Sequence, residues 1–102
     1  MRVFISAPYT KGDPVDNTRG VILIAELLCK MGHVPFVPHL TLFWHFLEPH
    51  EPQFWYDYDN EWLKVCDAVL RLPGDSVGAD NEVKLAQSLG IPVYYSVGDL
   101  RK

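Results

Sequence analysis

One acidic residue, Glu82, stands where a glycine-containing loop meets an expected helix. The segment before this loop, residues 68–72, is a short, mostly apolar run without strict alternation, which is typical of a strand covered on both faces. Glycine and proline interrupt the chain after it, and Asp80 is expected to cap the following helix. Because ligands of open α/β sheets bind at the carboxyl ends of the strands, this loop is the first candidate for a functional site.

The expected position of Glu82, in the first turn of the helix, favours the charged form of its carboxylate. Free backbone N–H groups and the helix dipole stabilise negative charge there, and a nucleophile or general base must be ionised at neutral pH. The loop, with Ser76, can also turn N–H and hydroxyl groups toward an anionic or hydroxylated ligand. An acid in a first turn is equally typical of a charge that only stabilises its helix, by under about 1 kcal/mol. Both interpretations remain open.

A second pair of acids, Asp57 and Asp59, lies near the expected start of an earlier helix. Residues at alternate positions do not share a helix face, so one of the two can point into the crevice while the other is solvated. Trp62 and Leu63 follow Asp59 by three and four residues, which makes Asp59 the inward candidate. An acidic first turn with no further role is the alternative.

Residues 38–62 are unusually aromatic, with eight aromatic side chains and three histidines. One interpretation is a wall that stacks on a planar ligand such as a nucleobase, because such stacking contributes about 1–3 kcal/mol per base. The other is packing within the protein, and we expect a mixture of the two. The spacing of the histidines and acids matches no zinc pattern, so we expect no metal and no cofactor; these residues are His39, His45, His50, Asp57 and Asp59.

Composition restricts the class of protein. The chain has 102 residues and a net charge of −4, which predicts a single domain without the basic stripe of a nucleic-acid polymer binder. The first ten residues contain too short an apolar run for a signal peptide, and no stretch reaches the roughly 20 apolar residues of a membrane span. We therefore expect a cytoplasmic protein without a membrane partner, in which Cys29 and Cys66 are buried thiols.

The pattern of elements predicts the fold class. We expect an α/β protein with a three-layer, flavodoxin-like open parallel sheet of four to five strands and helices on both faces. Apolar residues Ile22, Leu23 and Leu27 widen the stripe of the first long helix beyond what one sheet face requires, which indicates a subunit contact in a homodimer or larger homo-oligomer. The expected elements are strands at residues 2–6, 34–37 and 68–72, a last strand that ends at Tyr95, and helices at about 17–31 (capped by Asn17), 54–65 and 80–89.

Several segments together resemble the nucleoside 2-deoxyribosyltransferase family. They are SAPYT, Asn17, DNEWLKVCDAVL, LPGDSVGADNE and the GIPVYY that follows the last helix. The resemblance covers most of the chain, and the DNEWL and DSVGADNE segments are most similar to the 2'-deoxynucleoside 5'-phosphate N-hydrolase branch. It implies a small-molecule nucleoside or nucleotide as the substrate.

The resemblance also implies roles for individual residues. Glu82 would attack the anomeric carbon of the sugar, and Asp59 would handle the leaving base or a sugar hydroxyl. A carboxylate can stabilise the oxocarbenium-like state and trap it as a glycosyl ester, after which a second base or water completes transfer or hydrolysis. Substrate-binding positions implied in the same way are Ser6, Tyr9 (for the base), Asn17, and Ser76 with Gly78 (for the 5' end).

One departure from the family pattern motivates an alternative. The usual first-strand tyrosine that orients the glutamate aligns with Phe4, so Glu82 is expected to lack a hydrogen-bond partner. Together with the short chain, this suggests a non-catalytic nucleotide-binding sensor or interaction module on the same fold. A third interpretation, similarity to phosphoribohydrolases with a P-G-G-x-G-T-x-x-E loop, is weakened by the missing second glycine and threonine.

Overall fold

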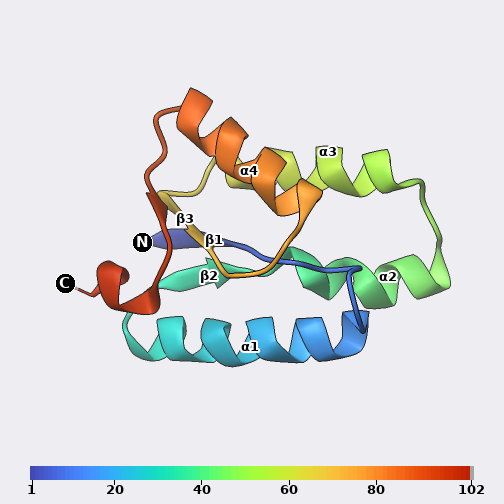
Figure 1. The fold of residues 1–102 in the computed structure, drawn as a ribbon, viewed down its shortest axis with the longest axis horizontal. Coiled ribbons are helices and arrows are strands. Elements are labelled where there is room, and N and C mark those ends of the chain that lie inside the picture. The colour runs from blue at the N-terminus through green and yellow to red at the C-terminus, as the bar shows by residue number, and fades with distance from the viewer. Residues whose placement is uncertain (102) are drawn as a thin grey trace.

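The computed structural model describes residues 1–101 and has a four-stranded parallel sheet with helices on both faces (Figure 1). The strand order is β2-β1-β3-β4 and every pair is parallel. The expected flavodoxin-like open sheet is therefore confirmed. The strands are β1 (Arg2–Ser6), β2 (Val34–Phe36), β3 (Ala68–Arg71) and β4 (Val93–Tyr94), and the helices are α1 (Pro14–Lys30), α2 (Thr41–Leu47), α3 (Pro52–Leu63) and α4 (Val77–Ser88), with 3-10 turns at Pro38–Leu40 and Val97–Leu100.

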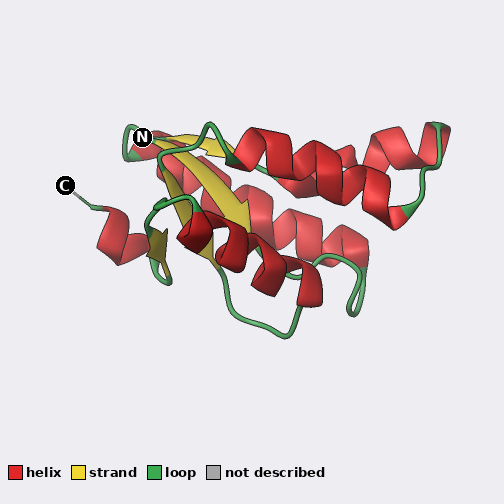
Figure 2. Cartoon of the chain, turned by 90° about the horizontal axis from the view of Figure 1, so that it is seen from above, coloured by secondary structure: helices red, strands yellow, loops and turns green. Residues whose placement is uncertain are grey.

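The central strand β1 separates two hydrophobic cores. Val3 and Ile5 point to the face that α1 covers, where they pack with Leu28 of that helix. Phe4 points to the opposite face and packs near Leu63. Helices α3 and α4 lie on that face of the sheet (Figures 1 and 2). Because side chains alternate along a strand, β1 supplies both cores and must be buried on both sides.

Helix α1 begins earlier than the sequence pattern predicts. Asp13 is the N-cap, and its side chain accepts a hydrogen bond from the Val15 backbone N–H at 2.9 Å. Pro14 occupies the first helical position, where its fixed φ suits a helix start. The expectation that Asn17 caps this helix was therefore wrong. The Asn17 amide instead donates to the backbone carbonyls of Tyr9 and Lys11, both at 2.8 Å, and so fixes the β1–α1 loop.

Helix α4 also begins before its predicted start. Ser76 is its N-cap and accepts from the Ala79 N–H at 3.1 Å, so Asp80 is not the cap but lies in the first turn. Glu82 consequently lies in the second turn rather than the first. Serine in extended backbone is a strong N-cap, and the carbonyl of Ser76 already accepts from the N–H of Asp80.

Helices α2 and α3 are joined through aromatic rings. Trp44 of α2 meets Trp55 and Tyr58 of α3 edge to face, with ring centroids 5.0 Å and 5.4 Å apart. Helix α2 buries none of its residues, and these ring contacts attach it to α3 together with a hydrogen bond from Trp55 to His45. We refer to residues 41–58 as the arm. These ring contacts show that part of the aromatic segment packs within the protein.

The outer face of α1 is exposed in the single chain. Ile22, Leu23 and Leu27 have 39%, 65% and 44% of their surface exposed, so the extra stripe is only partly covered within residues 1–101. Cys29 is also exposed, which contradicts the expectation of a buried thiol, while Cys66 is half-buried. No helix in residues 1–101 combines the length and the apolar character that crossing a membrane requires.

Gly74 brings two loops at the carboxyl end of the sheet together. Its φ is +118°, and a Cβ added there would lie 2.7 Å from Cγ of Pro8. We predict that Gly74→Ala lowers the free energy of unfolding by about 2–4 kcal/mol, because backbone strain adds to a steric clash. Urea denaturation measures this change.

Gly12→Ala is the matched control. Gly12 also has a positive φ, +84°, but has no atom within 4 Å of its added Cβ, so only backbone strain of about 1 kcal/mol is expected. Equal losses for the two variants would contradict the role given to the contact with Pro8.

Candidate active site

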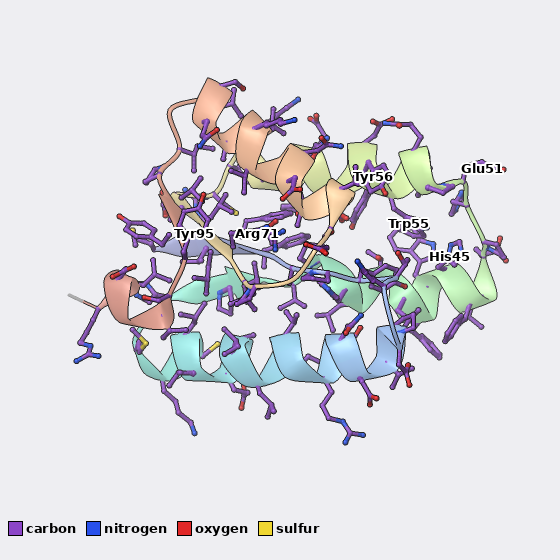
Figure 3. All side chains as sticks on the ribbon, viewed as in Figure 1. His45, Glu51, Trp55, Tyr56, Arg71 and Tyr95 are labelled. Atoms are coloured by element: carbon purple, nitrogen blue, oxygen red, sulfur yellow. The ribbon has the colours of Figure 1, made fainter. Side chains whose placement is uncertain are left out.

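A pocket of about 500 Å³ opens at the carboxyl ends of the strands. Its walls come from the β1–α1 loop, the turn at 38–40, the arm and the start of α4. Figure 3 labels three side chains that line it from the arm, which are His45, Trp55 and Tyr56. This volume is in the range of small-molecule sites.

Glu82 lines the pocket and is held by a serine from the central strand. Its Oε1 accepts a hydrogen bond from Oγ of Ser6 at 2.7 Å. Ser6 is fully buried at the end of β1, and its Oγ also lies 3.3 Å from the carbonyl oxygen of Ala79. The expectation that Glu82 lacks a hydrogen-bond partner because Phe4 replaces a tyrosine was therefore wrong.

The geometry of β1 explains why Ser6 takes this position. Phe4 and Ser6 are two residues apart, so both side chains point to the face covered by α3 and α4. Phe4 lies two residues before Ser6 in the strand. It is fully buried and stacks on Phe36, with ring centroids 5.5 Å apart. Ser6 lies at the carboxyl end, within reach of Glu82 in α4.

Arg71 lies outside the pocket lining but acts on Glu82 through its charge, and the sequence analysis missed it. It ends β3, its side chain is only 11% exposed, and its guanidinium donates to the carbonyls of Leu72 and Gly74 and to the carboxylate of Asp80. Its positive charge lowers the pKa of Glu82. A lone arginine at the end of an apolar strand is the signal that could have drawn attention to it.

Asp59 faces the pocket from the inner side of α3. It is 7% exposed, and within residues 1–101 its Oδ1 has no hydrogen-bond partner. Asp57 is exposed and accepts from the Gln53 amide at 2.8 Å. The expected inward orientation of Asp59 is therefore confirmed. Since α3 starts at Pro52, neither acid lies in its first turn.

The two carboxyl groups influence each other's protonation. Burial raises the pKa of Glu82 to about 7, although the hydrogen bond from Ser6 and the charge of Arg71 oppose the rise. Burial and then the charge of Glu82 raise the pKa of Asp59, also to about 7. The dipole argument for an easily ionised Glu82 was wrong, because this residue lies beyond the first turn and burial outweighs the stabilising groups.

The surroundings of the two acids indicate how a single proton is shared. Glu82 has a hydrogen-bond donor in Ser6 and a nearby cation in Arg71, and both favour its charged form. Asp59 has neither at Oδ1 and faces the negative charge of Glu82. Near neutral pH this arrangement favours a charged Glu82 and a protonated Asp59.

The other predicted substrate-binding residues fall into two groups. Tyr9, Ser76 and Gly78 line the pocket, whereas Ser6 lies behind Glu82 and Asn17 holds the loop from outside the pocket lining. Burial and the charge of Asp59, which lines the same pocket, raise the pKa of Tyr9.

Neither the histidines nor the acids form a metal site in the part of the chain that the structure describes. Across residues 1–101, no three His, Cys, Asp or Glu side chains are arranged to hold a metal ion. His45 accepts from Nε1 of Trp55 at 2.8 Å, and His39 contacts the Pro8 carbonyl oxygen at 2.8 Å, so both rings are engaged within the pocket wall.

The fold and site together define a flavodoxin-like α/β protein with paired carboxyl groups at the carboxyl end of its sheet. Residues 1–96 match the family described as Domain of unknown function (DUF7768), and the chain belongs to that family. No curated protein matches the sequence.

One solved structure with the same fold is described as the 2-deoxyribosyltransferase from the psychrotolerant bacterium Bacillus psychrosaccharolyticus. The two structures have a TM-score of 0.67 and 20% sequence identity, and the match covers 91% of this chain and 69% of the other. At this identity, the similarity shows a common fold.

We predict that Glu82→Gln stabilises the protein at about pH 8 and not at about pH 4.5. The pKa of Glu82 is raised in the folded state, so the folded protein holds the proton more tightly than the unfolded chain, and wild-type stability falls as pH rises from about 4 to about 7. Removing the buried charge should increase the free energy of unfolding at pH 8 by roughly 2–3 kcal/mol. Urea denaturation at both pH values measures the difference.

Asp57→Asn serves as the control, because Asp57 is exposed and its charge is hydrated in both states. A Glu82→Gln variant that is less stable than the wild type at pH 8 would contradict the burial of this charge.

Proposed function

We propose that this protein cleaves the N-glycosidic bond of nucleosides, deoxynucleosides or their 5'-monophosphates. The observation that carries the proposal is the pair of buried carboxyl groups in one pocket, with Glu82 held by Ser6 and Asp59 unpartnered at Oδ1. Similarity to a structure described as a 2-deoxyribosyltransferase supports it, since the carboxylates lie on a shared fold. Two acids with different surroundings suit glycosidic bond cleavage, in which one ionises and the other donates a proton.

In this proposal the charged Glu82 attacks the anomeric carbon of the sugar. A C–O bond forms between Glu82 and the sugar as the C–N bond breaks, and the electron pair leaves with the base. The protonated Asp59 donates its proton to the departing base. Water or a second base then attacks the glycosyl ester, Asp59 takes up the proton from the incoming group, and Glu82 is released as a carboxylate.

The rest of the pocket suits a ligand with a flat part and a polar part. Trp55, Tyr56 and Tyr9 contribute aromatic surface to the lining, on which a base can stack. Ser76 and Gly78 lie at the start of α4, where backbone N–H groups and a hydroxyl can bind the 5' end. We assign the base to the aromatic part and the 5' end to the start of α4.

The non-catalytic alternative depended on a missing partner for Glu82 and on the short chain. The hydrogen bond from Ser6 removes the first reason, because the catalytic candidate is oriented by a residue on the central strand. A sensor would bind nucleotides saturably and release no base, so the experiment below separates the two functions.

We predict that the wild type releases free base from at least one member of a panel of ribonucleosides, deoxyribonucleosides and their 5'-monophosphates. Glu82→Ala should lower the rate by at least about 10³-fold, because it removes the group that forms the ester, and Asp59→Asn by about 10²–10⁴-fold, because it removes the proton donor. Chromatography of the free bases, with and without an acceptor base, measures release and separates transfer from hydrolysis.

Asp57→Asn should retain the wild-type rate, since Asp57 lies on the same helix as Asp59 but is exposed. Full turnover by Glu82→Ala would overturn the proposed chemistry. Binding without release by the wild type would favour the sensor.

We also propose that the protein forms a homodimer or a larger homo-oligomer through the outer face of α1. Leu23 and Leu27 are exposed there, and Phe43, Phe46 and Leu47 of the neighbouring arm are 64–70% exposed. Exposed apolar surface on two adjacent elements is typical of an interface. The broad apolar stripe of α1 suggests that a second copy of this chain packs against it.

Light scattering at micromolar concentration should therefore give at least twice the monomer mass, and Leu23→Glu should reduce it to the monomer, because a charge would be buried in the interface. Glu26→Gln, on the same helix, is the matched polar control. A monomer mass for the wild type would refute the proposal.

A further inference from the structure

His39 is a buried pocket residue to which the proposed chemistry gives no role. It lies in the 3-10 turn at Pro38–Leu40, lines the pocket and is only 3% exposed. The ring of Tyr9 packs against it edge to face, with centroids 5.4 Å apart and an interplanar angle of 84°. The imidazole is therefore held in one orientation by packing.

The surroundings of the ring fix its tautomer. Nε2 lies 2.8 Å from the carbonyl oxygen of Pro8. A carbonyl oxygen only accepts hydrogen bonds, so the hydrogen of the neutral ring must be on Nε2. Burial lowers the pKa of His39, which keeps the ring neutral at physiological pH. Nδ1 consequently carries a lone pair and no hydrogen.

This lone pair has no partner within the part of the chain that the structure describes. Nδ1 is buried and makes no hydrogen bond to any atom of residues 1–101. A buried polar atom without a partner costs free energy, so such an atom in the wall of a ligand-sized pocket points to a partner on the ligand. Because Nδ1 can only accept, the ligand must supply the hydrogen.

We propose that His39 is a specificity-determining residue whose Nδ1 accepts a hydrogen bond from a neutral N–H or O–H donor of the bound ligand. The ligand class, a nucleoside or nucleotide, rests on the proposed function. Within that class the donor is either an amino group of the base or a hydroxyl of the sugar. A ligand with an acceptor or a methyl group at that place leaves Nδ1 unpaired and binds more weakly.

Two substitutions separate the binding role of His39 from its structural role. The side-chain amide nitrogen of His39→Gln can take the place of Nε2 and keep the bond to the Pro8 carbonyl, while nothing takes the place of Nδ1. His39→Asn reverses this, since its amide oxygen lies near the place of Nδ1 but its side chain is too short to reach the Pro8 carbonyl. If the role were only structural, Gln would behave as the wild type and Asn would be the damaged variant.

The tautomer can be tested without a ligand. In ¹⁵N-labelled protein, the NMR shifts of the His39 ring should show a protonated Nε2 and an unprotonated Nδ1 at pH 7. A protonated Nδ1 in the free protein would overturn the inference, because the nitrogen would then be a donor.

The binding role is tested by removing single donors from the ligand. Affinities of 2'-deoxyadenosine, purine 2'-deoxyriboside and the 3'- and 5'-deoxy analogues are measured by calorimetry in a Glu82→Gln background, which prevents turnover, with and without His39→Gln. One deletion should weaken binding by about 5- to 100-fold when His39 is present and by less than about twofold in His39→Gln. The donor is the base amino group or the sugar hydroxyl whose removal weakens binding when His39 is present but not in His39→Gln.

Equal sensitivity to every deletion with and without His39 would overturn the inference. Base release by the wild type together with that result would leave the proposed function intact and contradict only the role of His39. If the wild type neither binds nor cleaves any ribonucleoside, deoxyribonucleoside or 5'-monophosphate of the base-release panel, both the proposed function and this inference fail.

Discussion

The hydrogen bond from Ser6 to Glu82 is the constraint on which the site depends. It joins the end of the central strand to the second turn of α4, so the position of the carboxylate follows from the position of the sheet. The same bond, with the charge of Arg71, allows a carboxylate to remain ionised in a place where burial opposes its charge. Without such groups, a buried glutamate would be neutral and chemically inert as a nucleophile.

The second acid gains its proposed role from the first. Asp59 differs from Glu82 mainly in what surrounds it, since it faces a negative charge and has an unpartnered oxygen. Two groups of the same chemical type can therefore hold different protonation states in one pocket, as glycosidic bond cleavage requires. In the proposed function, the same principle applies to the ligand. Its glycosidic bond lies at the two acids, and one of its N–H or O–H donors lies at Nδ1 of His39.

The strands, the layers and the orientation of the helices could be predicted from short-range patterns in the sequence. Contacts between residues far apart in the sequence could not. Apolar runs gave the strands and the layered fold, and helical spacing gave the inward orientation of Asp59. The caps of α1 and α4 were misplaced because Asp13 before a proline and Ser76 compete successfully with Asn17 and Asp80, which local propensity alone does not rank. The partner of Glu82 could not be predicted, since no periodic signal connects it to Ser6.

The position of β1 at the centre of the sheet has a consequence for how the site forms. Ser6 and Glu82 are 76 residues apart, and β1 pairs with β2 on one side and with β3 on the other. Contacts of such high sequence separation form only after much of the chain has been ordered, which slows folding. The paired carboxylates therefore assemble together with the core rather than on a loop that opens by itself, and hydrogen exchange at the end of β1 should report the global unfolding of the protein.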